Sequence, residues 1–167
     1  MRPLASLGTV MHSMDSMKHE WTDADFDQMS WHDNAVHGLS IVEGIQGAGE
    51  LTLDIDYILE WLNCSSGKFQ FQVAPATLNF HDVTNLKIYI DYSIATAALT
   101  PFTIHQIHVE PLIYENGFIS KRWTVEVNWP KGEISFESSG FSQKLSRPAL
   151  LSKNQSLTKE QRTVENA

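Results

Sequence analysis

The sequence has a single cysteine, Cys64, among its 167 residues. One thiol cannot form a disulfide within the chain, and it excludes a structural zinc site built from several cysteines. Small secreted domains often depend on disulfides, whereas proteins of reducing compartments do not. The cysteine content therefore predicts a protein of the cytoplasm.

Basic side chains are also scarce. The chain has 12 Lys and Arg against 20 Asp and Glu, which gives a formal net charge of −8 at pH 7. Binding to nucleic acid or to an anionic membrane surface needs clustered Lys and Arg, so we expect neither partner. An acidic chain suits a basic protein partner, although acidity also serves solubility.

Long apolar runs and cofactor motifs are missing as well. No stretch approaches the roughly 18 consecutive apolar residues of a membrane-spanning helix. Residues 1–10 lack the apolar core of a secretory signal peptide. No glycine-rich phosphate loop and no nucleophile elbow occurs. We therefore expect a cytoplasmic protein that uses no cofactor.

What the sequence does contain is alternation of apolar and polar side chains with a period of two. Leu51, Leu53 and Ile55 share one parity, while Asp54 and Asp56 share the other. This period is typical of a strand with one buried face. The same alternation recurs at 37–41, 69–73, 78–80, 86–92, 102–109, 123–129 and 134–136.

Turn signals separate several of these segments. Asn-Gly at 116–117 tolerates positive φ at both central positions and favours a type I′ hairpin. Pro-Lys-Gly at 130–132 predicts a second hairpin. A phase slip within 102–109 predicts a β-bulge near His105 or Gln106.

The predicted fold is mainly β, a single antiparallel β-sandwich or strongly curved sheet of about seven or eight strands. Residues 29–143 are predicted to form this β domain. Its limits are turn chemistry at Asp33 and Asn34 and a change of charge near Lys144. Only residues 58–62 are expected to form a short helix inside it.

The two ends of the chain are predicted to lie outside the β domain. Residues 1–28 are expected to be a flexible arm or a short helix capped by Asp23. Residues 144–167 hold five basic and two acidic side chains and are rich in Ser, Gln and Asn. This composition predicts a disordered tail, with a weak helix at 158–162.

Four carboxylates are the candidate binding residues. Asp54 and Asp56 occupy the outward parity of their strand, Glu60 follows closely, and Asp91 lies at another outward position. Paired carboxylates can catalyse glycoside hydrolysis or bind calcium, but no calcium-loop spacing surrounds them, so a solvated strand face is the simpler interpretation. The functional hypothesis is an acidic docking surface for a basic protein.

Histidines and an aspartate form an alternative candidate site. His32 and Asp33 lie in a predicted turn, and His37 shares the inward parity of the next strand. With His105 they could bind a metal or catalyse hydrolysis if they converge in space. His105 and His108 point to opposite faces of a strand unless the bulge rotates one of them. A buried, hydrogen-bonded histidine and a capping aspartate are the structural interpretation.

Three segments within residues 29–115 are distinctive as a set: Trp31–Asn34 with His37–Gly38, Leu51–Asp56 leading to Glu60–Trp61, and Pro75–Phe80. The set resembles small bacterial β-domain proteins of unassigned function, some of which are grouped with immunity proteins of polymorphic-toxin systems. The resemblance implies a small β domain that binds a cognate toxin and has no catalytic activity. It brings no set of functional residues to this chain.

The sequence thus favours a non-enzymatic, protein-binding domain of an immunity-like kind. Two alternatives stay open. One is a metal-dependent or hydrolytic enzyme that uses the histidine and aspartate cluster. The other is a β domain that holds a small apolar ligand between its sheets, which the five tryptophans motivate.

Overall fold

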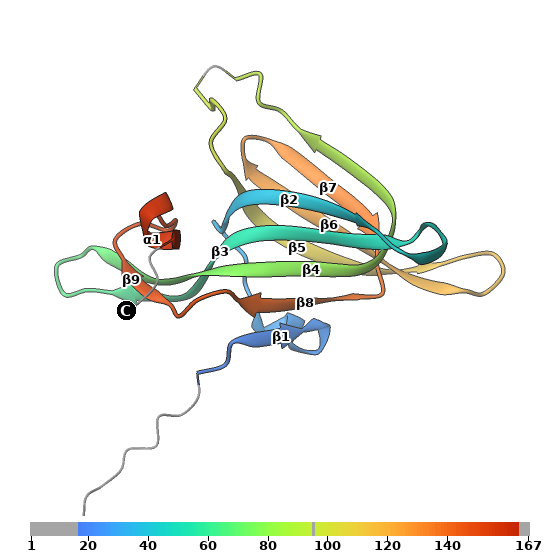
Figure 1. The fold of residues 1–167 in the computed structure, drawn as a ribbon, viewed down its shortest axis with the longest axis horizontal. Helices are drawn as coiled ribbons and strands as arrows, with labels where there is room; N and C mark the ends of the chain where they lie inside the picture. The colour runs from blue at the N-terminus through green and yellow to red at the C-terminus, as the bar shows by residue number, and fades with distance from the viewer. Residues whose placement is uncertain (1–16, 95, 164–167) are drawn as a thin grey trace, which may run out of the picture.

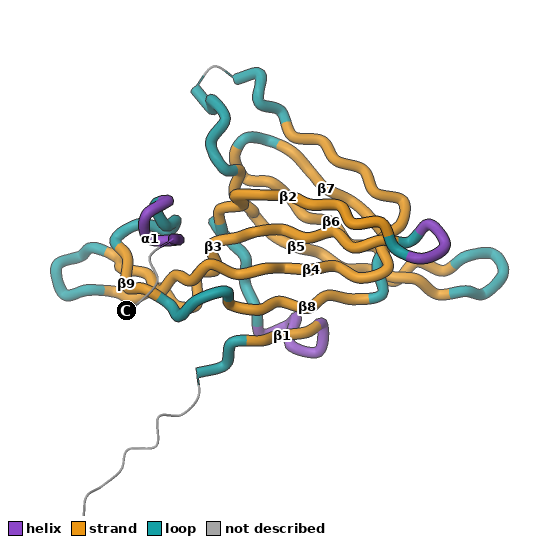
Figure 2. Tube along the Cα trace, in the orientation of Figure 1, coloured by secondary structure: helices purple, strands orange, loops and turns teal. Residues whose placement is uncertain are grey.

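The computed structural model describes residues 17–94 and 96–163, and most of them lie in strands (Figure 2). The strands are β1 (Glu20–Thr22), β2 (Ala35–Glu43), β3 (Gly49–Asn63), β4 (Phe69–Ile90), β5 (Phe102–Ile113), β6 (Ile119–Trp129), β7 (Gly132–Glu137), β8 (Gly140–Leu145) and β9 (Leu150–Ser152). The helical elements are η1 (Asp23–Gln28), η2 (Ile45–Gly47) and α1 (Lys159–Thr163). None of these described helices is long and apolar enough to span a membrane. The prediction of a mainly β protein is confirmed.

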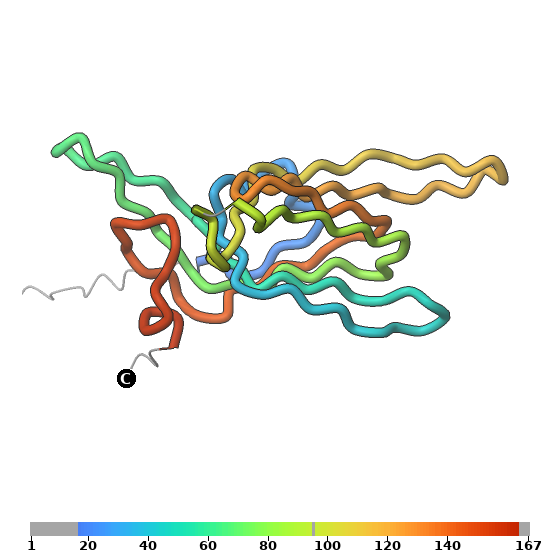
Figure 3. Tube along the Cα trace, turned by 90° about the horizontal axis from the view of Figure 1, so that it is seen from above, coloured from blue at the N-terminus to red at the C-terminus, as the bar shows by residue number. Residues whose placement is uncertain are grey.

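One antiparallel sheet contains all of these strands, in the order β1-β8-β4-β3-β2-β5-β6-β7, and β9 pairs with β4 (Figure 1). β4 also pairs with β7, which stands at the far end of that order. The sheet must therefore curve until its end meets its own middle. Seen from above, β2 and β3 form one layer and β5 and β6 the other (Figure 3). The prediction of a strongly curved sheet is confirmed.

β4 carries the chain from one layer to the other. Its first part pairs with β3, β8 and β9, whereas Thr84–Ile90 pairs with β7. At the bend between these parts, Asp82 and Asn85 each have a φ of 52°. Asp and Asn adopt this left-handed conformation at lower cost than most residues that carry a Cβ. Pro75 lies where the neighbouring strand changes from β9 to β8, a position that needs no N–H donor.

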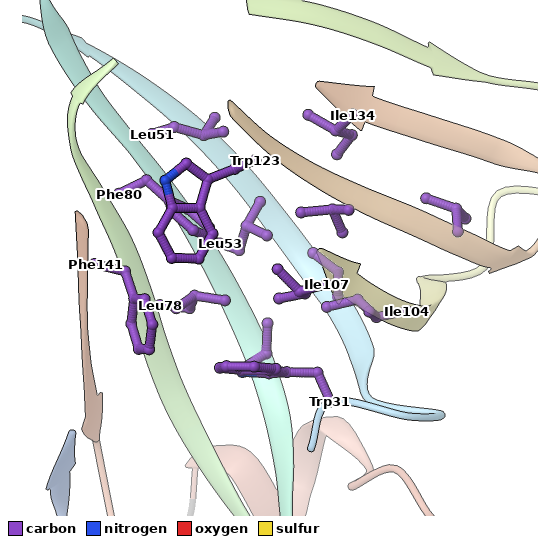
Figure 4. Packing of buried hydrophobic residues seen from close by; sticks show 14 of the residues in the cluster. Trp31, Leu51, Leu53, Leu78, Phe80, Ile104, Ile107, Trp123, Ile134 and Phe141 are labelled. Atoms are coloured by element: carbon purple, nitrogen blue, oxygen red, sulfur yellow. The ribbon is translucent and has the colours of Figure 1, made fainter. Parts of the chain in front are cut away.

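The hydrophobic core fills the space between the two layers (Figure 4). Leu51 and Leu53 of β3 are fully buried in the same cluster as Trp123 of β6. The Phe80 ring lies 5.4 Å from the Trp123 ring and 4.7 Å from that of Phe136. Burial contributes about 1.5–3 kcal/mol for each large apolar side chain. Packing in the core is therefore the main contribution to the stability of the curved sheet.

Both predicted hairpins are present, but the first uses a different turn. Of the Asn116-Gly117 pair, only Gly117 has a positive φ, 81°. The Gly117 N–H donates to the Tyr114 carbonyl at 2.9 Å, and the Tyr114 N–H donates to the Phe118 carbonyl at 2.8 Å. These bonds define a three-residue loop that ends in a left-handed glycine, not a type I′ turn. Asn116 acts through its side chain, which accepts the Phe118 N–H.

The sequence predicts a bulge correctly and a helix wrongly. The pairing of β5 with β6 shifts register between Ile104 and Gln106, which confirms the bulge near His105. Residues 58–62, predicted to be helical, continue β3 and pair with β4. Pairing satisfies their backbone groups and buries Ile58, which an isolated helical turn cannot do.

The N-terminal prediction holds only in part. Residues 1–16 of the arm lie outside the described residues. β1 pairs with β8, so the sheet begins before residue 29. The predicted short helix is the 3-10 helix η1, but Thr22 and not Asp23 is its N-cap residue. The Thr22 N–H donates to the Asp25 carboxylate at 3.0 Å.

The prediction of a disordered tail is wrong for residues 144–163. This segment completes β8, adds β9 to the edge of β4 and ends in α1, where the weak helix was predicted. Its composition is polar, but Leu157 is buried in a small cluster with Ile58, Phe71 and Val73. Leu157 and polar contacts with Asp56 of β3 hold the segment against the sheet.

Candidate functional site

The four candidate carboxylates do not form one acidic surface. Asp54 and Asp56 both lie on the outer side of β3, as their parity predicts, but Asp56 is 0% exposed. Asp54 and Glu60 are exposed. Asp91 lies beyond the end of β4, beside the β6–β7 turn, where its N–H donates to the Lys131 carbonyl. The predicted docking surface is therefore incomplete, because the C-terminal segment covers one of its members.

Asp56 anchors that C-terminal segment. Its Oδ2 accepts the Leu157 N–H at 2.8 Å and lies 2.7 Å from His37 Nε2. The Arg162 guanidinium donates to Oδ1 of Asp56 and to Oδ1 of Asp54. A buried carboxylate is tolerated only when it is paired and hydrogen-bonded in this way. We call Asp56, His37, Leu157 and Arg162 the Asp56 latch.

The histidine site of the alternative hypothesis is only partly assembled. The His32 and His105 rings have centroids 5.3 Å apart, and His32 Nε2 lies 3.5 Å from Asp33 Oδ2. His37, however, belongs to the Asp56 latch. Within residues 17–94 and 96–163, no three His, Cys, Asp or Glu side chains are placed to hold a metal ion.

The inward orientation predicted for His37 is wrong. The pairing of β2 with β3 shifts register between Val36 and Gly38. Because a one-residue shift exchanges the two faces of a strand, Val36 enters the core and His37 turns to the outer side, toward Asp56. An isolated phase slip of this kind leaves no mark in the alternation of 37–41.

A chain of hydrogen bonds that crosses β3, β4 and β8 could not be found from sequence. Ser142 Oγ lies 3.0 Å from His81 Nε2, and His81 Nδ1 lies 2.7 Å from Glu50 Oε2, which also accepts Asn79 Nδ2. Hydroxyl, imidazole and carboxylate in this order resemble a nucleophile with its base and orienting acid. The three residues are 31 and 61 positions apart, and no local motif joins them.

We assign this chain of bonds a structural role. Acyl transfer also requires free N–H donors aimed at the developing oxyanion. At Ser142 the backbone of β8 is paired with Thr22 of β1 on one side and with Asn79 of β4 on the other. The side chains therefore tie three strands together on the outer side of the sheet.

Two hairpins extend from the same end of the molecule, β2–β3 and β5–β6 (Figure 3). They belong to different layers but leave a common point, because β2 pairs with β5 only at Ala35–Thr103 and Val36–Phe102. Farther along, β2 pairs only with β3 and β5 pairs only with β6 in the described part of the chain. The two layers therefore separate toward the hairpin ends.

The apolar residues on the core-facing side of the β5–β6 hairpin extend past the buried part of the hairpin. The register of β5 with β6 is unbroken from Gln106 to Ile113. Ile113 and its partner Ile119 therefore lie on the same face as the buried Ile107 and Trp123. The two residues are nevertheless 69% and 64% exposed.

The β2–β3 hairpin also has an exposed apolar residue on its core-facing side. Ile41 pairs with the buried Leu51 in an unbroken register, so it also lies on the core-facing side. It is 64% exposed. Single exposed apolar side chains are common on proteins, but apolar residues that extend a core onto two separated hairpins are typical of an interaction surface.

Two adjoining hollows lie beside the turn ends of these hairpins. One, of about 450 Å³, lies between the β2–β3 hairpin and the β4 bend. The other, of about 520 Å³, is lined by the β5–β6 hairpin, the β4 bend and the β7–β8 turn. Thr84 lines both. We call the two hollows, together with Ile41, Ile113 and Ile119, the hairpin groove.

The hairpin groove is acidic. Its one cationic side chain, Lys121, is already 3.1 Å from Asp23 Oδ2. Its acidic lining residues are Glu43, Glu50, Asp82 and Glu137, of which Glu50 and Glu137 direct their carboxylates to partners on the outer side of the sheet. In the described part of the chain, Glu43 has neither an ion pair nor a side-chain hydrogen bond. Such a lining favours a ligand that combines apolar and cationic groups.

Glu137 holds the turn end of the β5–β6 hairpin. Its Oε1 accepts the Tyr114 hydroxyl at 2.5 Å and Asn85 Nδ2 at 2.7 Å. The bond from Tyr114 holds the pKa of Glu137 below its ordinary value of 4.5, and contacts with Asn85, Ser120 and Arg122 act in the same direction, while burial opposes them. The same bond raises the pKa of Tyr114.

A second exposed apolar group lies at the tip of the β3–β4 hairpin. Trp61 and Phe69 are both about half exposed. The Trp61 ring packs at 5.0 Å against Phe71 and at 6.3 Å against Phe69. These rings cover one another, whereas Ile41, Ile113 and Ile119 lie on two hairpins that separate toward their ends (Figure 3).

Comparisons of the chain with protein-family models, with curated proteins and with solved structures found no match. The resemblance to immunity-like β domains therefore stays a prediction. The hairpin groove combines exposed, core-facing isoleucines with acidic side chains.

Proposed function

We propose that this protein is a protein-binding domain whose hairpin groove takes up an apolar segment of a partner that carries lysine or arginine. The observation that supports the proposal most strongly is the exposure of Ile41, Ile113 and Ile119 on the core-facing sides of two separated hairpins. A partner segment placed between the hairpins would complete a core that the chain leaves open.

The chemistry of the partner follows from the lining. Apolar side chains would cover the isoleucines, and burial contributes up to roughly 2 kcal/mol for each of them. Association itself costs several kcal/mol, so apolar contact alone gives weak binding. Lysine or arginine opposite Glu43 and Asp82 would add attraction and orientation.

The proposed partner is of the basic class that the sequence predicts, but the residues proposed to contact it are different. A basic partner was expected at Asp54, Asp56, Glu60 and Asp91, whereas the hairpin groove offers Glu43 and Asp82. An immunity-like role is compatible with it, because such a domain acts by covering part of another protein.

Selection from a random peptide library displayed on phage tests the proposal, with the full chain as the immobilised target. We expect enrichment of peptides with two or more large apolar residues and at least one Lys or Arg. Their binding should fall at least about tenfold on the double variant Ile41→Asp, Ile113→Asp, because the apolar contacts are lost and two carboxylates would be desolvated against the peptide's apolar side chains.

Leu99→Asp is the matched control, since Leu99 is also highly exposed but lies in the loop between β4 and β5. It should bind the selected peptides as the parent does. Circular dichroism establishes that each variant is folded. The proposal is wrong if no motif is enriched, or if the enriched peptides bind the double variant as tightly as the parent.

A further inference from the structure

One backbone edge of β2 is unpaired where it borders the hairpin groove. β5 occupies that edge only at Ala35 and Val36. From Gly38 to Glu43 the strand pairs with β3 on its other side and, within residues 17–94 and 96–163, with no further strand. Backbone N–H and C=O groups on that edge are therefore free to pair with an added strand.

This edge has fewer protective features than the open edge of β5 or the short strands β1 and β9, and its only charged residue, Glu43, stands at its end. Natural edge strands are shortened, bulged, or given Lys or Pro to prevent further pairing. The open edge of β5 has the bulge near His105 and Pro111, and β1 and β9 are three residues long. Residues 38–43 contain neither Lys nor Pro, and their register is unbroken.

The edge is also accessible and two-sided. Residues 40–43 are exposed. Ile41 lies on the core-facing side, and Ser40 and Val42 therefore lie on the outer side. A strand added here would place alternate side chains toward the groove and toward solvent, with one end beside Glu43.

We infer that the partner segment binds in extended form, as an additional β-strand on the Gly38–Glu43 edge of β2. This inference rests on the proposed function and specifies its geometry. The bound segment alternates apolar and polar residues, and its Lys or Arg lies at the end that meets Glu43. Main-chain hydrogen bonds supply affinity, and the residues that face Ile41 supply specificity.

Backbone methylation of a bound peptide tests this geometry. A peptide selected on the full chain is synthesised in a series, each member carrying one N-methyl group at successive positions. In an added strand, alternate N–H groups point to β2, so methylation at every second position should weaken binding by about tenfold or more, through a lost hydrogen bond and a steric clash. Methylation at the positions between should change the dissociation constant by less than about threefold.

The outcomes separate this inference from the proposed function. If the peptides bind the parent and not the double variant, yet methylation shows no alternation with a period of two, strand addition is wrong and the groove proposal stands. If no peptide binds in a manner that depends on Ile41 and Ile113, the proposed function itself is wrong. Titration calorimetry of the methylated series against the full chain, with the unmethylated peptide as reference, gives the required constants.

Discussion

The Leu157 N–H donates to Asp56 Oδ2 at 2.8 Å, across 101 positions of sequence. A carboxylate that strand parity places on the outer side of β3 is thereby closed off from solvent by the C-terminal segment. The contact explains two departures from the sequence predictions together, the burial of Asp56 and the order of the tail. It also gives the C-terminal segment a measurable contribution to stability.

The substitution Leu157→Ala, which shortens a buried side chain, should destabilise the protein. Leu157 is 4% exposed, and Leu→Ala in a packed cluster costs about 2–3 kcal/mol or more. Leu151→Ala is the control in the same segment, because Leu151 is 56% exposed and should cost less than about 1 kcal/mol. Urea unfolding followed by tryptophan fluorescence measures both. Equal effects of the two substitutions would mean that the segment does not pack as described.

Neutralising Asp56 should lower the free energy of unfolding more than neutralising Asp54. Asp56→Asn removes the buried charge that Arg162 and His37 contact, and we expect a loss of about 2–3 kcal/mol in the free energy of unfolding. Asp54→Asn removes a half-exposed partner of the same guanidinium and should cost no more than about 1 kcal/mol. The comparison uses urea titrations at pH 7. A larger effect at Asp54 would contradict the Asp56 latch.

Stability in acid should depend on Tyr114. The pKa of Glu137 is lowered in the folded protein, chiefly by the Tyr114 hydroxyl. Its contribution to stability is therefore present above the ordinary value of 4.5 and is lost as the pH falls through the lower, folded pKa. Tyr114→Phe should reduce the free energy of unfolding at pH 6, and the difference from the parent should shrink as the pH approaches 3.

Tyr89→Phe serves as the control for that measurement, since Tyr89 is exposed and has no side-chain hydrogen bond in the described part of the chain. Its unfolding free energy should follow the parent at every pH. A constant difference between Tyr114→Phe and the parent from pH 6 to pH 3 would show that the Glu137 carboxylate is not the linked group.

The strands could be predicted from the sequence because their signal is local. Leu51, Leu53 and Ile55 alternate with polar neighbours, and the structure places them in the core as expected. Parity even placed Asp56 on the correct side of the sheet. Its burial could not be predicted, because the cover comes from Leu157, whose polar surroundings in the sequence carry no periodic signal.

The hairpin groove could not be predicted for a related reason. The alternation of Ile41 with its neighbours indicates a core-facing residue, and this is correct. Its exposure depends on where the pairing of β2 with β5 ends, at Val36 and Phe102. The bulges of both strands lie next to that point, and they belong to the long-range pairing of a curved sheet.

Hydrogen–deuterium exchange of the full chain, with and without a saturating selected peptide, tests the hairpin groove most directly. We predict slower exchange on binding in residues 38–43 and in the facing part of the β5–β6 hairpin, around Ile113 and Ile119. The tip of the β3–β4 hairpin, at Trp61 and Phe69, should exchange at an unchanged rate. Protection confined to that tip or to the C-terminal segment, with none in residues 38–43, would contradict the proposal that partners bind in the hairpin groove.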